Sequence, residues 1–189
     1  YPGAGVDTPN HAYSFSFARP HKWSRFFSPQ SDLETYLRQT ADEFDVTTHI
    51  QFGTELTGAN WSDDRQDWQV ELATPHGIET RTYRVLISAI GQLNVPKPPP
   101  VPGTDGFDGP CFHSSRWPAD LDITGKRVAI IGTGASSMQI APAIADQVAS
   151  LTVYQRTAQW ARPVPRYHDP IPEGSQWLFE HLPFYASWF

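Results

Sequence analysis

The sequence has 189 residues, of which 39% are hydrophobic and 13% aromatic, and its formal net charge is -6. This length and apolar content suit one or two globular domains, and the acidic balance gives no electrostatic reason to expect nucleic acid as a partner. No apolar run approaches the ~20 residues that span a bilayer, so we expect no membrane partner. The single cysteine, Cys111, excludes an internal disulfide, and we expect a cytoplasmic protein.

The two ends of the sequence are unusual. The chain starts at Tyr1, its only methionine is Met138, and residues 182–189 are rich in aromatic side chains. A native carboxyl terminus rarely leaves such a cluster exposed. We therefore expect the chain to be an internal piece of a longer protein.

The first half of the chain carries helix and strand signals in turn. Ser31 and Glu34 form a capping-box pattern, and the apolar spacing that follows predicts an amphipathic helix over 32–44. Short apolar runs then predict four strands, of which the last three are joined by short turns and form an antiparallel meander. The run at 85–90 is almost continuously apolar, which is typical of a strand in a buried parallel sheet. The four strands are expected at 46–52, 55–60, 68–74 and 78–89.

A proline-rich stretch at 95–102 separates two halves of different composition. Its prolines exclude a helix or a central strand, so we expect a stiff linker there. After a loop, a strand at 127–131, a helix at 136–148 and a strand at 151–155 predict a βαβ unit. Pro142 lies inside this helix and should kink it or loosen its second turn. A last helix is expected at 176–181.

The turn between the 127–131 strand and the following helix is rich in glycine. Gly132 allows a tight turn, Gly134 lets the backbone approach a pyrophosphate, and the helix N-terminus directs free N–H groups toward the anion. Ser137 replaces the third glycine of the usual pattern, still packs closely and can donate a hydroxyl. An ordinary strand–turn–helix is the alternative. The expected dinucleotide site consists of Gly132, Thr133, Gly134, Ser136, Ser137 and Gln139.

The end of the second strand indicates which dinucleotide binds. An NAD site usually has Asp or Glu there, about 20 residues after the glycines, to bind the ribose 2′-hydroxyl. Here the sequence has Arg156 followed by Thr157. A guanidinium can pair with the 2′-phosphate that a carboxylate would repel, so the sequence predicts a preference for NADPH. A solvated surface arginine is the alternative.

A sparse pattern precedes the βαβ unit: Phe107-x-Gly109-x-x-x-His113-x-x-x-Trp117-Pro118. Its spacing matches no helix or strand period. It resembles the fingerprint of single-component, FAD-containing Baeyer–Villiger monooxygenases, which belong to the flavin monooxygenase superfamily. On the residues alone, His113 could instead cap a backbone group and Trp117 could anchor a core.

Two further segments carry the same resemblance. The start of the chain, Tyr1-Pro2-Gly3-Ala4-Gly5-Val6-Asp7, is similar to the end of a second signature of that family, although Asp7 alone could be a turn residue. Residues 181–189 resemble the aryl-ketone branch typified by 4-hydroxyacetophenone monooxygenase.

The resemblance implies a fold and a reaction. The chain would be an α/β fragment of a flavoprotein with two dinucleotide-binding domains, with the β-meander in the FAD part and a Rossmann-type NADP part. Residues 1–92 would form the C-terminal portion of the FAD-binding domain, 93–124 a linker with the fingerprint, and 125–189 the N-terminal portion of the NADP-binding domain. With FAD, NADPH and O₂, the whole enzyme would insert oxygen next to a ketone carbonyl and form an ester or lactone.

The resemblance also implies roles for single residues. Asp7 would lie near the flavin and hold an active-site arginine supplied from farther along the full chain. Tyr13, Leu56 (through its backbone) and Gln92 would lie close to the flavin or the nicotinamide. His113 and Trp117 would belong to the linker that couples domain rotation to catalysis. Many members carry Arg where this chain has Gly5, so one contact to the nicotinamide region would be missing.

Three alternative functions deserve weight. The first is a flavin monooxygenase that oxygenates nitrogen or sulfur, against which Trp117-Pro118 and Asp7 argue. The second is a disulfide or quinone reductase. Because the sequence has a single cysteine, the version of that enzyme that uses a redox dithiol is excluded. The third is a non-catalytic NADP-binding fragment, and we expect the isolated piece to be inactive. The histidines show no metal-ligand spacing, so we assign no metal site.

Overall fold

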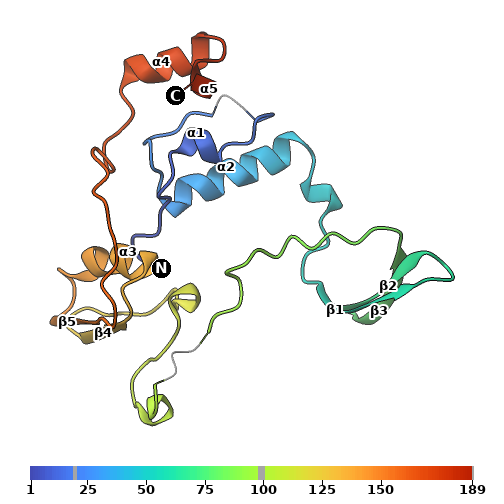
Figure 1. Ribbon diagram of the computed structural model, residues 1–189, viewed down its shortest axis with the longest axis horizontal. Helices are drawn as coiled ribbons and strands as arrows, with labels where there is room; N and C mark the ends of the chain where they lie inside the picture. The colour runs from blue at the N-terminus through green and yellow to red at the C-terminus, as the bar shows by residue number, and fades with distance from the viewer. Residues whose placement is uncertain (19–20, 98–100, 189) are drawn as a thin grey trace. The chain divides into compact units, whose positions relative to one another are not determined.

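The computed structural model describes residues 1–18, 21–97 and 101–188 (Figure 1). The chain divides into two compact units, one formed by Tyr1–Thr40 with Pro96–Phe189 and the other by Ala41–Val95. The predicted linker at 95–102 includes residues 98–100, which lie outside the described residues. The predicted division into an FAD portion, a linker and an NADP portion remains a prediction.

The first unit contains a small aromatic core. Helix α1 (Asn10–Tyr13) has no counterpart in the sequence prediction, whereas α2 (Gln30–Glu43) confirms the predicted helix. The predicted capping box is wrong, because the helix begins at Gln30 and Ser31 therefore lies inside its first turn. Tyr36 is only 1% exposed, and its hydroxyl accepts a hydrogen bond of 2.7 Å from the N–H of Phe15. The other core side chains are Ala18, Trp23 and Ile171, with Phe26, Leu33 and Phe179 packed against them.

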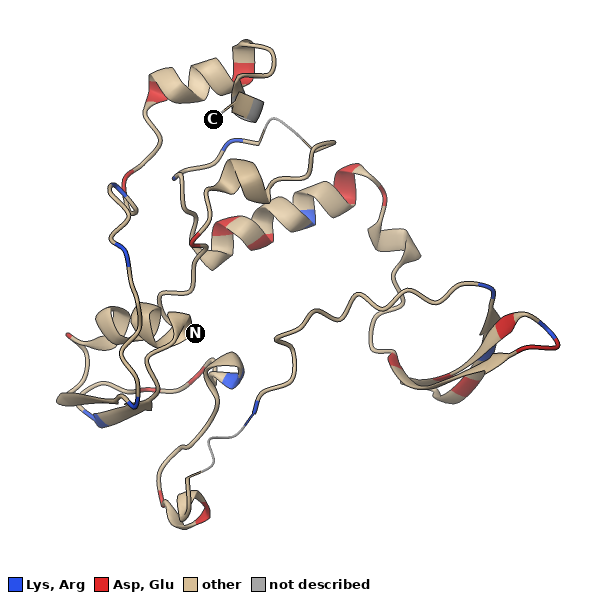
Figure 2. Ribbon diagram, in the orientation of Figure 1, with Lys and Arg blue, Asp and Glu red and all other residues tan. Residues whose placement is uncertain are grey.

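Acidic side chains predominate along α2 (Figure 2). Asp32, Glu34, Asp42 and Glu43 accompany a single arginine, Arg38. The guanidinium of Arg38 donates a hydrogen bond of 2.7 Å to Glu34 one turn away, and this bond lowers the pKa of the Glu34 carboxyl. The helix therefore offers no basic surface to a polyanion.

The predicted strand at 46–52 is wrong. Asp45 ends α2 with a φ of +54°, and the N–H of Val46 donates a 2.8 Å hydrogen bond to the carbonyl of Ala41. The N–H of Asp45 donates to the carbonyl of Asp42, which completes a Schellman cap. The chain then forms a 3-10 turn at Thr47–His49 instead of an extended strand.

The second unit confirms the predicted meander. Strands β1 (Glu55–Ser62), β2 (Asp67–Thr74) and β3 (Gly77–Tyr83) form an antiparallel sheet in the order β1-β2-β3. Val70 of the central strand is 1% exposed. A cross-strand pair of tryptophans, Trp61 and Trp68, has ring centroids 5.5 Å apart, as expected for residues in register on neighbouring strands.

The predicted strand at 78–89 ends early, at Tyr83, and the parallel strand expected at 85–90 is absent from the described residues. Its apolar side chains are exposed, with Ile87 at 82% and Ile90 at 73%. A parallel strand needs a partner strand with which to form its ladder, and this segment pairs with none of the described strands.

The βαβ unit is confirmed. Strands β4 (Arg127–Ile131) and β5 (Ser150–Tyr154) pair in parallel and are connected by α3 (Ala135–Ile144). The helix is four residues shorter than its predicted end at 148 and stops two residues after Pro142, which has no N–H for the helical ladder. Ile140 and Ile144 form the buried side of α3, at 4% and 0% exposed.

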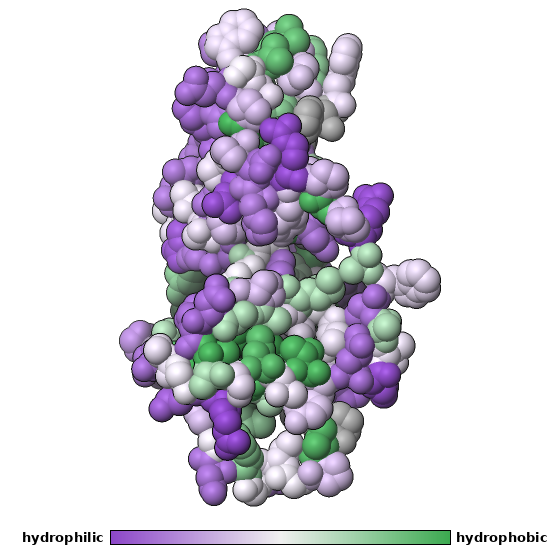
Figure 3. Space-filling model, turned by 90° about the vertical axis from the view of Figure 1, so that its left-hand side faces the viewer, coloured by the Kyte–Doolittle hydropathy of each residue, from purple (hydrophilic) through white to green (hydrophobic). Residues whose placement is uncertain are grey.

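One face of this two-stranded sheet is open. Ile131 is 56% exposed and Tyr154, its partner in register on the same face, is 59% exposed, and apolar side chains gather over β4 and β5 in Figure 3. Parallel strands are normally covered on both faces. An exposed apolar face of this kind is typical of a parallel sheet that other secondary structure covers.

The end of the chain returns to the aromatic core. Helix α4 (Glu173–His181) confirms and extends the predicted helix at 176–181, and a short helix, α5 (Tyr185–Trp188), follows. The side chain of Gln176 donates a 2.7 Å hydrogen bond to the carbonyl of Trp23. This bond and Phe179 hold α4 on the core.

Candidate functional site

The turn after β4 has the geometry of an anion-binding loop. Gly132 has a φ of +104°, which side chains with a Cβ rarely adopt. Gly134 has ordinary extended angles, φ −70° and ψ 179°, so conformation alone does not require glycine there. A Cβ added at either glycine would meet no protein atom within 4 Å. Because neither strain nor packing explains Gly134, the space it leaves suits a bound group.

The N-terminus of α3 faces this space with unsatisfied donors. The first helical hydrogen bond runs from the N–H of Met138 to the carbonyl of Gly134, at 3.1 Å. The N–H groups of Ala135, Ser136 and Ser137 have no acceptor among the described residues, and no side chain caps the helix. Together with the helix dipole they form a site for a phosphate.

Hydrogen bonds bring the end of β5 to the same place. The N–H of Gly132 donates to the carbonyl of Tyr154 at 2.9 Å. The hydroxyl of Thr133 donates to the carbonyl of Thr157 and accepts from the side chain of Gln155, both at 3.4 Å. The glycine turn and the 155–157 segment are therefore neighbours at the carboxyl edge of the sheet, where α/β proteins bind ligands.

Arg156 lies in that neighbouring segment. Its side chain is exposed, and no carboxylate among the described residues forms an ion pair with it. An unpaired guanidinium next to a set of free N–H groups makes this edge attractive to a ligand with more than one phosphate.

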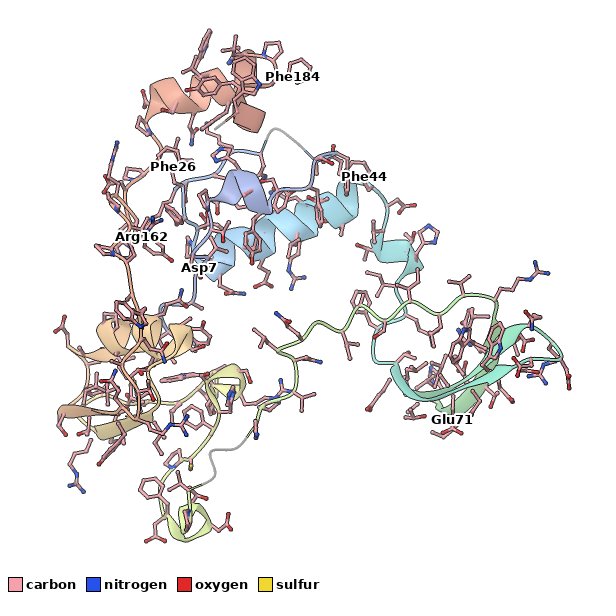
Figure 4. The ribbon with its side chains drawn as sticks, in the orientation of Figure 1. Asp7, Phe26, Phe44, Glu71, Arg162 and Phe184 are labelled. Carbon is pink, nitrogen blue, oxygen red and sulfur yellow. The ribbon has the colours of Figure 1, made fainter. Side chains whose placement is uncertain are left out.

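Asp7 lies on the loop that precedes α1 (Figure 4). Its carboxylate is exposed and accepts a long hydrogen bond, 3.4 Å, from the hydroxyl of Thr8. The preceding residues are held more firmly. The N–H of Val6 donates to the carbonyl of Ser28 at 3.1 Å, and the hydroxyl of Tyr167 donates to the carbonyl of Val6 at 2.5 Å.

Gln139 of α3 holds the same loop. Its side-chain amide donates to the carbonyl of Gly5 at 2.8 Å and accepts from the hydroxyl of Tyr1 at 2.9 Å. The side chain of Gln139, which the sequence predicts to bind a dinucleotide, thus contacts the start of the chain in this structure. A Cβ on Gly5 would lie 3.1 Å from the carbonyl oxygen of Ser28, so a larger residue is tightly confined at this position.

The fingerprint residues form local contacts. A Cβ on Gly109 would lie 2.6 Å from the ring of Phe107, so the ring packs directly over the glycine. The imidazole Nδ1 of His113 accepts from the N–H of Ser115 and thereby caps a 3-10 turn. Trp117, which precedes Pro118, packs edge-on against the ring of Phe112 at 5.3 Å.

The remaining predicted residues belong to different units of the chain. Tyr13 lies in the first unit and is 52% exposed. Leu56 and Gln92 lie in the second unit, where both are exposed. Leu56 borders a β-bulge, because the pairing register between β1 and β2 shifts between Leu56 and Gly58.

The described part of the chain contains no cluster of three or more His, Cys, Asp or Glu residues that could hold a metal ion. No helix within that part is long and apolar enough to cross a bilayer. Tyr167 is the functional candidate that the sequence did not reveal, since its partner Val6 is 161 positions away and no local pattern signals the contact.

Comparison with known proteins identifies relatives for almost the whole chain. The profile of the flavin-binding monooxygenase-like family matches residues 10–169. A Baeyer–Villiger monooxygenase of Streptomyces coelicolor is 45% identical over 183 residues, covering 97% of this chain and 34% of that protein.

Solved structures of proteins similar to this chain are also known. OTEMO in complex with FAD and NADP is 37% identical, with a TM-score of 0.84 over 93% of this chain and 34% of that one. Cyclohexanone monooxygenase from Rhodococcus sp. Phi1, bound to NADP⁺, is 36% identical, with a TM-score of 0.83 over 93% of this chain and 33% of that one. The chain thus spans about a third of the length of these relatives.

Proposed function

Because the chain belongs to the flavin-binding monooxygenase-like family, we propose that it forms part of an enzyme that uses FAD, NADPH and O₂ to oxidise a ketone to an ester or lactone. One oxygen atom of O₂ enters the bond between the carbonyl carbon and a neighbouring carbon. The other oxygen atom leaves as water, and NADPH together with one proton supplies the two electrons and two hydrogens that this water requires. The names of the Streptomyces and Rhodococcus relatives, a Baeyer–Villiger and a cyclohexanone monooxygenase, support this reaction class.

The observation that carries the proposal is the edge of the β4–β5 sheet. There the glycine turn, the free N–H groups of α3 and Arg156 lie next to one another. Residues 135–137 would bind the pyrophosphate of NADP through their backbone, and the hydroxyls of Ser136 and Ser137 would add donors. Arg156 with Thr157 would bind the 2′-phosphate and so distinguish NADPH from NADH. The dinucleotide-bound relatives support this assignment.

The FAD side of the proposal rests on the second unit and the Asp7 loop. FAD would supply the activation of O₂. The bulge beside Leu56 interrupts the ladder between β1 and β2, which frees backbone groups to bind a cofactor edge. Gln92 and Tyr13 offer exposed polar groups for the flavin or nicotinamide. Asp7, with its exposed carboxylate, would hold a cationic group of the complete active site.

Replacement of Arg156 tests the dinucleotide assignment. Isothermal titration of the complete protein should show NADP⁺ binding about 10- to 100-fold weaker in Arg156→Ala, the loss expected for a charge-assisted hydrogen-bond pair. NAD⁺ lacks the 2′-phosphate, so its affinity should stay within about threefold. The control is Arg65→Ala at the β1–β2 turn, which also removes one positive charge but lies in the second unit. Equal affinity of the wild type for NADP⁺ and NAD⁺ would contradict the role of Arg156.

Two alternatives give different outcomes. An enzyme that oxygenates nitrogen or sulfur would convert an amine or sulfide and leave ketones unchanged. A non-catalytic NADP-binding protein would bind NADP⁺ in the titration but consume no NADPH with FAD and any of these substrates. Product analysis with a ketone, an amine and a sulfide therefore separates the three functions. We also propose a cytoplasmic location, with which the free thiol of Cys111 agrees.

A further inference from the structure

We propose that Tyr167 is a positioning residue for Asp7. The inference rests on the proposed function only in the role that it gives Asp7; the contact itself is independent of that role. Tyr167 lies on the segment that follows β5, and this segment runs beside the loop of Asp7 (Figure 4). A residue of the dinucleotide half of the chain would thus fix the aspartate near the flavin.

The backbone next to Asp7 is held from two sides. The hydroxyl of Tyr167 donates to the carbonyl of Val6 at 2.5 Å, while the N–H of Val6 donates to the carbonyl of Ser28 at 3.1 Å. The side chain of Val6 is 9% exposed, so the residue is anchored by packing as well. The loop also has an antiparallel bridge between Gly5 and Pro29.

Tyr167 is itself firmly placed. Its ring stacks on Phe27 with centroids 5.0 Å apart and planes 23° from parallel. Arg166 before it has a φ of +61°, an unusual value, and its guanidinium forms an ion pair with Asp169 at 2.8 Å. Beyond the turn, the N–H of Ile171 donates to the carbonyl of Ser24 at 3.0 Å, and Ile171 is part of the core.

The Asp7 side chain has much weaker support. Its carboxylate is exposed and its hydrogen bond from Thr8, at 3.4 Å, is near the limit of a useful interaction. The position of the carboxylate is therefore decided by the backbone of Val6 and Asp7, which is the part that Tyr167 holds. Removal of the Tyr167 hydroxyl should loosen this backbone and leave the ring stack intact.

Tyr167→Phe in the complete protein tests the inference, with Tyr83→Phe as the matched control. Tyr83 is an exposed tyrosine at the end of β3 in the second unit, outside the proposed machinery. Hydrogen–deuterium exchange of the peptide containing Val6 and Asp7 should be about tenfold faster in Tyr167→Phe, as expected for the loss of one hydrogen bond. The turnover number for ketone oxidation should fall about three- to tenfold, whereas KM for NADPH and the melting temperature should match the control.

Each outcome is decisive. Unchanged exchange of this peptide would overturn the tether. Faster exchange with an unchanged turnover number would overturn the positioning role. A parallel loss of turnover and NADPH affinity would show a general disturbance of the dinucleotide site and also overturn it. If wild type and control oxidise no ketone, the proposed function fails, and the exchange result alone decides whether Tyr167 holds the loop.

Discussion

Two glycines show how a single hydrogen atom in place of a side chain can serve different ends. At Gly134, neither the backbone angles nor crowding by neighbouring atoms requires a glycine, and the open space next to it suits a ligand. Gly3 is the opposite case. Its φ is +75°, and a Cβ there would lie 2.5 Å from the carbonyl oxygen of Gln139. The start of the chain therefore approaches the backbone of α3 as closely as glycine allows.

Gly3→Ala should destabilise the protein by about 1–3 kcal/mol, because alanine would strain the backbone and push the loop away from α3. Urea denaturation measures the change in free energy of unfolding. The control is Gly174→Ala near the start of α4, where an added Cβ meets nothing within 4 Å. Alanine at that helical position should stabilise by about 0.4–1 kcal/mol. A Gly3→Ala protein as stable as the control would show that the loop does not pack on α3.

His21 should make stability depend on pH. Burial beside Trp23 and Tyr36 lowers the pKa of its imidazole, against a weaker opposite effect of Asp32. The unfolded chain therefore binds the proton more readily than the folded chain. The contribution of His21 to the free energy of unfolding is fully present above about pH 6.5 and is lost as the pH falls toward the lowered pKa of the folded state.

Thermal melts at pH 7.5 and 5.5 measure this effect. His21→Asn should lose part of the decrease in melting temperature that wild type shows at the lower pH. His76→Asn, at the exposed turn between β2 and β3, controls for the loss of a histidine as such. A wild type whose melting temperature rises on acidification would contradict the direction of the pKa shift.

At the scale of elements, the βαβ unit depends on a thin core. Helix α3 buries Ile140 and Ile144, while β4 and β5 keep an open apolar face. With few buried side chains, each contributes a large share of the stability of this unit. The geometry of the glycine turn follows from this packing, because α3 must stay against the sheet for its N-terminus to face the ligand.

Ile144→Ala should therefore cost about 2–5 kcal/mol of unfolding free energy, the usual range for truncating a fully buried isoleucine. Met138→Ala in the same helix is the control, since Met138 is 50% exposed and its loss should change stability by less than about 0.5 kcal/mol. Guanidinium denaturation of both variants gives the comparison. Equal effects would mean that α3 does not pack through Ile144.

Elements with a strong local signal were predictable. The meander at 55–83 and the βαβ unit at 127–154 have alternating or periodic apolar residues and turn residues between them, and both are confirmed. The strand expected at 46–52 failed because Asp45 and Val46 complete the cap of α2, a choice that apolar content does not reveal. The strand expected at 85–90 failed for another reason, because this segment pairs with no other strand among the described residues.

Some contacts of the candidate site could likewise be predicted from the sequence, and others could not. The proximity of the glycine turn and Arg156 follows from the βαβ connection and could be read from the sequence. The tethers of the Asp7 loop could not. Gln139 and Tyr167 contact residues 134 and 161 positions away, and only the folded chain shows that these segments meet.

At the scale of the whole molecule, the residues proposed for the two cofactor sites are distributed over both units of the chain. The first unit contains the edge at β4 and β5 and the Asp7 loop, and the second contains the meander with Leu56. The chain spans about a third of its relatives' length. We therefore expect the isolated chain to consume no NADPH with FAD and a ketone, and the complete protein to do so.

The most direct test of the central claim is the fate of labelled oxygen. The complete protein is incubated with FAD, NADPH, ¹⁸O₂ and a panel of cyclic and aryl ketones, and the products are analysed by mass spectrometry. We predict an ester or lactone that carries one ¹⁸O atom between the carbonyl carbon and the carbon that was its neighbour, with one NADPH consumed for each molecule of product formed. Unchanged ketone, together with an ¹⁸O-labelled product from an added amine or sulfide, would contradict the account.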